Sequence, residues 1–354
     1  TVVVMFQDFS MKTPQQILQS LLPPGVKYTP HLMAMPIPKA TSSAVINRDP
    51  STMAMNNSSM QMSSDMKVGA NMKMNHPIMS ADLNDVKYDA YLVNYHSPAD
   101  PQITKVKAGT QVKLRFINGA SASNFWVNLG KLNGTLVAVD GQDIKPIKGN
   151  KFQIAMAQRL DVIISIPKQG GTFPILGQVE GLKDQTGIIL STLDKPQPKY
   201  ISSQAAQPAA ALDYHQELQL HSLAQASTFM DKPVILNLNL TGDMKRYTWQ
   251  INGQMWPHIT PLQVKQGQNV IMVIQNSSMM AHPMHLHGYD FKVVNIDGKP
   301  VNGALHDTIL VLPYSKVTVE FAADYSGKWV LHCHTVYHMA TGMMTYLEVE
   351  PKSF

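Results

Sequence analysis

The sequence predicts an all-β protein that contains two copies of one β-sandwich or β-barrel domain. The segment "QVKLRFIN" at 111–118 places apolar residues at every second position, which is typical of a half-buried strand. Turn-forming pairs such as Asp140-Gly141 and Gly170-Gly171 separate segments of this kind. A set of residues also recurs at a constant offset of 158 positions, from Val106 to Val264 onward, which indicates an internal duplication.

Length and composition limit the classes of function. The chain has 354 residues, of which 44% are hydrophobic and 15% charged, enough for two or three domains with cores of their own. The net charge of +5 is spread along the chain, so we predict no nucleic-acid site. No run of about 18 apolar residues exists, so we predict no membrane span. A single cysteine excludes an internal disulfide and leaves the compartment open.

The first 25 residues begin like a strand, and the residues from 11 onward are ambiguous. The chain starts at Thr1 directly with strand-like residues, so we expect the edge of a domain whose upstream neighbour is absent. The segment "TPQQILQSLLPPG" predicts one short helix that is ended by Pro23 and Pro24.

Between residues 50 and 80 the composition changes sharply. This segment lacks aromatic residues and is rich in Met, Asn and Ser, so it cannot bury much surface, and we expect a mobile insertion. Thioethers are soft ligands that select Cu(I). The structural alternative is a flexible linker with incidental methionines, but methionine is an unusual choice for exposed coil. We therefore predict Cu(I) binding by Met53, Met55, Met60, Met62, Met66, Met72, Met74 and Met79.

The internal repeat defines the domains. Asn94 matches Asn252 at the same offset, and the best-matched segments are "VKAGTQVKLRFIN" and "VKQGQNVIMVIQN". We predict a first domain at 1–195 that carries the Met-rich insertion, a linker at 196–212, and a second domain at 213–354. The linker is rich in Pro, Ala and Gln, which suits an extended connection.

The segment "WVLHCHTVYHMATGM" at 329–343 contains the only cysteine, Cys333. If it opens on a strand, side chains alternate between faces, so Cys333 points one way and His332 and His334 the other. We therefore predict two metal sites back to back.

Ligand chemistry supports that prediction. A thiolate, two histidines and a weak methionine form the ligand set of a blue-copper electron-transfer site. The segment "AHPMHLHG" supplies His282, His285 and His287, of which the last two share a strand face. The structural alternative is a small apolar core cysteine with hydrogen-bonded histidines. So many ligands in two short segments favour metal binding.

Together, "HPMHLHG" and "HCHTVYHMATGM" resemble the paired copper signatures of multicopper oxidases, the family of laccases and bacterial copper-resistance oxidases. The resemblance implies cupredoxin-like Greek-key domains. It also implies that a type 1 copper is held by His282, Cys333, His338 and Met343. By the same resemblance His285 would be a type 2 ligand, and the type 3 ligands would be His287, His332 and His334.

The resemblance further implies one-electron oxidation of a substrate at the type 1 copper and reduction of O2 to water at a three-copper cluster. Cys333, His332 and His334 would carry electrons inward, because their backbone is covalently continuous. The reducing substrate would be Cu(I) or a phenol, and the compartment the periplasm.

The sequence departs from the family pattern in one respect. A complete cluster takes four H-x-H pairs, and this chain has two, 285/287 and 332/334. In three-domain relatives the other pairs lie in the first domain, which we expect to be absent here. The first repeat has no ligands at the matching positions, where we align Asn124, Val127 and Leu129, and Leu176, Gly177 and Gln178.

Two alternatives remain. The chain is either an oxidase of this family or a non-catalytic copper-binding or electron-transfer module. A two-domain oxidase that completes its cluster between subunits would need H-x-H pairs in the first repeat, which are missing. For the remaining histidines, we expect His306 to be structural and name no partner for His258. Met255 and Trp256 are candidates for the approach to the type 1 site.

Overall fold

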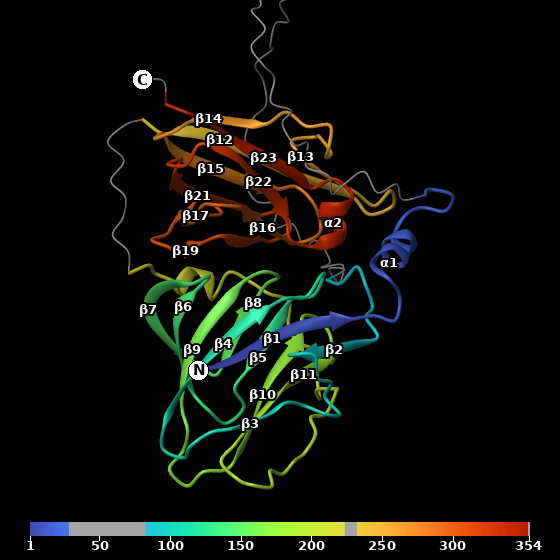
Figure 1. Cartoon of the computed structure of the whole chain (residues 1–354). Helices are drawn as coiled ribbons and strands as arrows, with labels where there is room; N and C mark the ends of the chain where they lie inside the picture. The colour runs from blue at the N-terminus through green and yellow to red at the C-terminus, as the bar shows by residue number, and fades with distance from the viewer. Residues whose placement is uncertain (28–82, 224–231, 353–354) are drawn as a thin grey trace, which may run out of the picture. The chain divides into compact units, whose positions relative to one another are not determined.

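The protein is described by a computed structural model over residues 1–27, 83–223 and 232–352. Within these residues the strands form four sheets, two from each half of the chain (Figure 1). The all-β prediction is confirmed. The Met-rich segment at 50–80, with its predicted Cu(I) ligands, lies outside the described residues.

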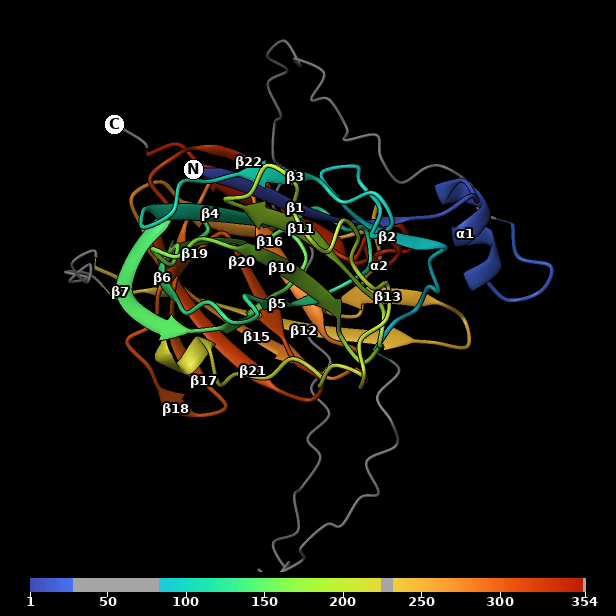
Figure 2. The ribbon, with the colours of Figure 1, turned by 90° about the horizontal axis from the view of Figure 1, so that it is seen from below.

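The first half forms a six-stranded sheet in the order β2-β1-β4-β9-β6-β7 and a five-stranded sheet in the order β3-β11-β10-β5-β8. β1 runs parallel to β4 and lies beside it (Figure 2). The strands are β1 (Val2–Phe9), β2 (Ala90–Val93), β3 (Ile103–Lys105), β4 (Gln111–Asn118), β5 (Phe125–Asn128), β6 (Gly134–Val139), β7 (Gln142–Gly149), β8 (Lys151–Ile154), β9 (Arg159–Ser165), β10 (Thr172–Val179) and β11 (Gln185–Ser191).

The second half repeats this arrangement strand for strand. Its sheets run β13-β12-β15-β21-β17-β18 and β14-β23-β22-β16-β20, and β19 pairs with β17. The strands are β12 (Val234–Asp243), β13 (Thr248–Ile251), β14 (Leu262–Lys265), β15 (Asn269–Asn276), β16 (His282–Leu286), β17 (Phe291–Ile296), β18 (Lys299–Pro300), β19 (Leu305–His306), β20 (Thr308–Val311), β21 (Lys316–Ala322), β22 (Gly327–Cys333) and β23 (Met344–Glu350). We call the two halves the first copy and the second copy.

The repeated asparagines explain what the duplication preserves. Asn94 and Asn252 both have a positive φ, and each accepts from and donates to the backbone of the first strand of its copy. Asn118 and Asn276 are buried at the end of their strands, and the side-chain amide of each donates to at least two backbone carbonyls. Because buried amides are almost always hydrogen-bonded, both copies keep these asparagines together with their backbone partners.

The local predictions for the first copy agree with the structure. Helix α1 spans Pro14–Leu21, and its N-cap residue Thr13 forms a capping box with Gln16. It ends before Pro23, because proline cannot continue a helix. In β4 every second side chain is buried. Asp140 and Gly141 both have positive φ values and form the hairpin turn between β6 and β7.

One alignment was wrong by a single residue. The N–H of Leu129 donates to the Asn150 carbonyl as that of Leu286 does to the Asp307 carbonyl, and the buried pair Val127 and Gly177 corresponds to the buried pair Met284 and Cys333. The counterparts of His282, His285 and His287 are therefore Phe125, Asn128 and Gly130, whereas the register agrees with the alignment of Leu176, Gly177 and Gln178 with His332, Cys333 and His334. None of these residues supplies an imidazole or a thiolate, so the conclusion about the first copy is unchanged.

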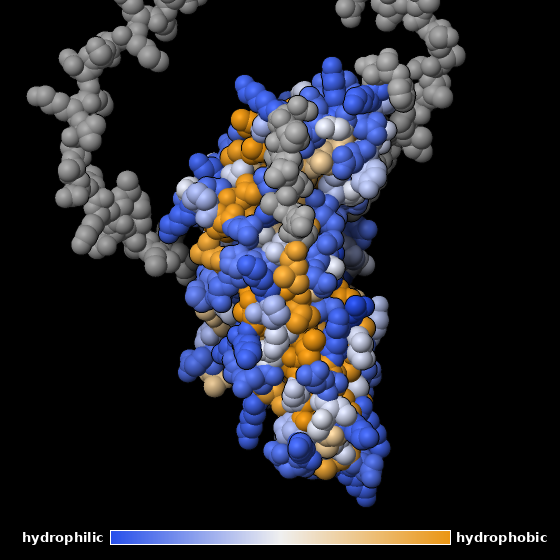
Figure 3. Space-filling view, turned by 90° about the vertical axis from the view of Figure 1, so that its left-hand side faces the viewer, coloured by the Kyte–Doolittle hydropathy of each residue, from blue (hydrophilic) through white to orange (hydrophobic). Residues whose placement is uncertain are grey.

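Charged and polar side chains cover most of the face shown in Figure 3, with hydrophobic groups between them. No helix among the described residues is long and apolar enough to cross a bilayer.

Candidate copper centres

Two hydrogen-bonded strands place the candidate ligands. β16 begins at His282 and β22 ends at Cys333. Met284 lies opposite Cys333, and His285 lies opposite His332. Because successive side chains of a strand point to opposite faces, the thiol and the flanking imidazoles are separated. The strand register therefore places Cys333 on one face and His332 and His334 on the other, as the sequence predicts.

One face of this strand pair carries three converging ligand atoms. The Nδ1 atoms of His282 and His338 are 3.1 Å apart, and Cys333 Sγ lies 3.7 Å from the first and 3.8 Å from the second. All three residues are fully buried. Atoms that bind one metal ion at about 2.0–2.3 Å lie about 3–4 Å from one another. The three atoms therefore fit a shared ion.

The hydrogen bonds on the far side of each ring support this fit. His338 Nε2 is 2.7 Å from Asp85 Oδ2, so it donates to the carboxylate. His282 Nε2 is 2.7 Å from Ser278 Oγ, whose own hydrogen is directed to Asn276. Both Nδ1 atoms then present lone pairs to each other, and a bound cation removes that repulsion.

Charge leads to the same conclusion. Burial lowers the pKa of His282 well below its usual value, so the ring is neutral. Burial also raises the pKa of the Cys333 thiol to about 12. A metal ion deprotonates a coordinating thiol outright. The donor set is thus complete for a soft or borderline cation and unfavourable for an anion.

The other two predicted type 1 ligands come from the segment after β22. Helix α2 (Val336–Ala340) carries His338 in its last turn. Met343 is fully buried, its N–H donates to the carbonyl of His338, and its carbonyl accepts from the N–H of Cys333. The backbone thus returns Met343 to the side of Cys333.

Three residues that support this group were not identified from the sequence. Trp249 stacks on the His338 ring with centroids 3.9 Å apart, and it meets His282 edge-on. Asp85 accepts from His338 and from the Tyr247 hydroxyl. Burial favours a raised pKa for Asp85, but these two hydrogen bonds outweigh it and lower the pKa. No motif or spacing connects residues 85 and 338.

The opposite face carries the imidazoles of His285, His287 and His332, whose ligand atoms lie within 4.8 Å of one another. The Nε2 atoms of His287 and His332 are 3.1 Å apart. His334 lies beside this group, with its ring centroid 5.6 Å from that of His332, and its Nδ1 is buried without a hydrogen-bond partner. We call His285, His287, His332 and His334 the imidazole group.

Three rings of the imidazole group have lowered pKa values, and one of them is already oriented for metal binding. Burial lowers the pKa of His332 to about 3, and burial together with the neighbouring rings lowers the pKa of His287 and of His334. His332 Nδ1 lies 2.9 Å from the Cys333 carbonyl, which leaves Nε2 free as a ligand atom. Neutral imidazole is the form that binds metals.

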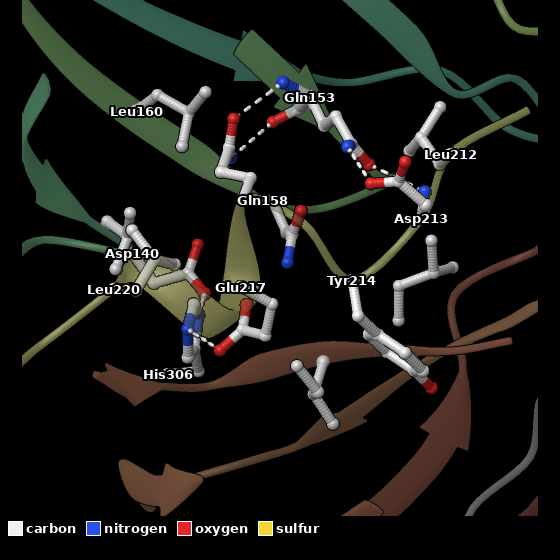
Figure 4. Close-up of a pocket in the computed structure, with 14 residues that line it drawn as sticks. Asp140, Gln153, Gln158, Leu160, Leu212, Asp213, Tyr214, Glu217, Leu220 and His306 are labelled. Carbon is white, nitrogen blue, oxygen red and sulfur yellow. Dashed lines mark hydrogen bonds and ion pairs between the residues drawn. The ribbon is translucent and has the colours of Figure 1, made fainter. Parts of the chain in front are cut away.

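Ion pairs between the copies lie next to the imidazole group. Arg159 donates to both carboxylate oxygens of Asp307, at 2.8 and 2.6 Å. His306 Nδ1 lies 2.8 Å from Asp140 Oδ2 and its Nε2 3.3 Å from Glu217 Oε1 (Figure 4). These carboxylates outweigh the effect of burial and raise the pKa of His306 to about 10. The structural role expected for His306 agrees with this geometry.

Of the remaining candidates, His258 is exposed and its backbone pairs with that of Met255, whereas Trp256 is buried. The N–H of Trp256 donates to the Gly342 carbonyl, one residue before Met343.

Two family models match the chain, both described as multicopper oxidase, one over residues 1–194 and the other over 229–353. Multicopper oxidase MmcO of Mycobacterium tuberculosis is 32% identical over 83% of this chain and 56% of its own length. Copper resistance protein A of Escherichia coli is 25% identical over 81% of this chain and 63% of its own length.

Solved structures share the fold. Fet3p, a multicopper oxidase that functions in iron import, has a TM-score of 0.70 at 14% identity, over 98% of this chain and 65% of its own. The laccase from Botrytis aclada has a TM-score of 0.67 at 17% identity, over 99% of this chain and 64% of its own. This chain thus spans about three fifths of the length of such relatives. It belongs to the multicopper oxidase family, whose members use copper to oxidise their substrates.

Proposed function

We propose that this chain carries the substrate-oxidising copper site of a laccase-like or cuprous oxidase and half of its oxygen-reducing copper cluster. The type 1 ion would be held by His282, Cys333, His338 and Met343. The type 2 ligand would be His285, and the type 3 ligands His287, His332 and His334. The observation that carries the proposal is the convergence of one thiol and two imidazoles directly behind the imidazole group.

Bound copper would supply one-electron oxidation of the substrate and four-electron reduction of O2 to water. The protein's contribution is to connect the two sites and to keep water from the type 1 site. Cys333 is bonded through the backbone to His332 and His334, so the shortest route between the two groups is covalent. Trp249, which packs on His338, keeps water from the buried ligands.

A cavity beside His338 could admit the reducing substrate to the type 1 site. It has a volume of about 100 Å³, and Asp85, Met156, Met279 and Met280 are among its lining residues. Asp85 Oδ1 is buried without a hydrogen-bond partner. Thioethers suit Cu(I) as the substrate, and the methionines at 50–80 would supply it. A phenol is the other substrate class.

The cluster needs ligands that this sequence does not contain. Its two H-x-H pairs are half of the four that the family pattern requires. We assign the other two to a further cupredoxin domain, in the same polypeptide or in a partner chain. His287 is exposed, so its side of the imidazole group is open to such a domain.

We assign residues 1–195 to a ligand-free cupredoxin domain, 196–212 to a linker and 213–354 to the copper-binding domain. We assign the protein to the periplasm, because relatives include copper resistance proteins of Pseudomonas syringae and Escherichia coli. Fractionation of cells that express the natural gene product tests the compartment. Recovery in the cytoplasm overturns it.

The deciding experiment is copper analysis of the purified chain with paramagnetic resonance. We expect one type 1 signal per chain and substoichiometric copper at the imidazole group. A chain that takes up no type 1 copper overturns the proposal.

The second candidate is a non-catalytic copper-binding or electron-transfer module, which the half-complete set of H-x-H pairs favours for the chain alone. Oxygen consumption distinguishes the two. Addition of the domain that supplies the missing ligands should produce O2 uptake coupled to Cu(I) or phenol oxidation. Persistent inactivity with full copper loading favours the module.

A further inference from the structure

We propose that Arg159, which belongs to the ligand-free first copy, is a positioning residue for His285 and fixes which ring nitrogen of His285 is available to a metal. This inference rests on the proposed function, because it assumes that His285 is a copper ligand. It gives the first copy a part in building the copper cluster, although that copy contains no ligand of its own.

The first step is the surroundings of His285 Nδ1. This atom lies 2.8 Å from the carbonyl oxygen of Asp307 and 3.0 Å from Thr308 Oγ1. The Thr308 hydroxyl donates its hydrogen to Asp307 Oδ1, so its oxygen accepts from the ring. These two neighbours of Nδ1 are therefore both acceptors, and they favour the tautomer that carries its hydrogen on Nδ1. The lone pair of Nε2 is left for a metal.

The second step is what holds these acceptors. The Asp307 carboxylate is 3.6 Å from His285 Nδ1, close enough to compete with the carbonyl for the ring hydrogen. The guanidinium of Arg159 occupies both carboxylate oxygens at 2.8 and 2.6 Å. Such a two-point contact fixes the carboxylate plane as well as its position. The carbonyl and Thr308 Oγ1 thus remain the partners of the ring.

The third step is the anchoring of Arg159 itself. The guanidinium also donates to the carbonyls of Ala157 and Asp140, at 3.1 and 3.0 Å. Asp140 in turn accepts from the backbone N–H of Arg159 and from His306 of the second copy. The adjacent residues His306 and Asp307 are therefore both held by the first copy, and a shift between the copies would move the acceptors of His285.

The test measures the tautomer directly in the metal-free chain. Nitrogen-15 NMR of the imidazoles, with His285 assigned from the His285→Gln variant, should show one form with hydrogen on Nδ1. Arg159→Met should shift His285 toward a mixture with hydrogen on Nε2. Arg159→Lys keeps the charge without the two-point geometry and should give an intermediate result. Arg115→Gln is the control, because Arg115 lies on β4 and pairs with Asp161 of β9, the strand that also carries Arg159.

A second measurement follows Cu(II) binding to the same proteins, with the type 1 signal as an internal standard. Loss of an outer partner of a ligand typically weakens metal binding by about 10–100-fold. We expect that loss at the imidazole group in Arg159→Met and an unchanged type 1 site. If Arg159→Met does not fold, Arg159→Lys decides.

The outcomes separate the two proposals. An unchanged His285 tautomer in Arg159→Met, or in Arg159→Lys where Met does not fold, overturns the positioning role and makes Arg159 only a tie between the copies. A shifted tautomer in a chain that binds no Cu(II) at the imidazole group supports the positioning role and overturns the proposed function.

Discussion

The Oδ2 atom of Asp85 lies 2.7 Å from Nε2 of His338, and both side chains are buried. The two residues are 253 positions apart in the sequence. A carboxylate behind a ligand imidazole increases the electron density of that ring and so favours the oxidised metal. This contact is therefore expected to influence the reduction potential of the type 1 site.

Asp85→Asn should raise the reduction potential of the type 1 copper, because a neutral amide stabilises Cu(II) less than a carboxylate. A loss of about 1 kcal/mol corresponds to roughly 40–50 mV for a one-electron couple. Redox titration of the blue absorption measures it. Asp89→Asn is the matched control, since Asp89 is exposed and binds Ser10 and the Met11 backbone. Equal potentials in the two variants would refute the role of Asp85.

Cys333→Ser should abolish the intense thiolate-to-copper absorption, because a serine oxygen cannot provide that transition. The β fold should remain, as far-ultraviolet circular dichroism would show. Blue colour in Cys333→Ser would end the type 1 assignment.

His285→Gln should keep the blue colour and weaken copper binding at the imidazole group, since the two sites lie on opposite faces of the strand pair.

His306 should remain protonated well above neutral pH. The carboxylates of Asp140 and Glu217 face its two ring nitrogens, and its pKa is raised to about 10 from 6.5. Its contribution to stability is thus fully present below about pH 6.5 and disappears as the pH rises through 10. A carbon-13 NMR titration of the ring should show no change between pH 6 and 8.

The same contact predicts a pH-dependent stability. His306→Gln should lower the free energy of unfolding by on the order of 2–4 kcal/mol near pH 6.5. The difference from the parent protein should shrink between pH 7 and 10 in urea unfolding. A difference that is constant with pH would show that His306 acts by packing rather than by charge.

Deletion of residues 50–80 should reduce Cu(I) binding and oxidation more than oxidation of phenols, because only Cu(I) needs soft thioether ligands. The control replaces the eight methionines of this segment with glutamine and keeps its length. If both substrates lose activity equally, the segment acts through its bulk rather than its sulfur atoms.

The sequence by itself determined the fold and the identity of the candidate ligands. Period-two alternation and the repeat at an offset of 158 depend on neighbouring residues, so they can be read without a structure. The same alternation separates Cys333 from His332 and His334. This is why the two faces of the site were predictable from 15 residues at 329–343.

Only the tertiary structure decided what surrounds those ligands. Asp85 and Trp249 reach His338, and Arg159 reaches Asp307 across 148 positions, through contacts between elements that are far apart in the sequence. Such contacts depend on how sheets and loops pack, and no local period encodes them. For the same reason the one-residue error in the alignment of Val127 became visible only when the strand pairs were known.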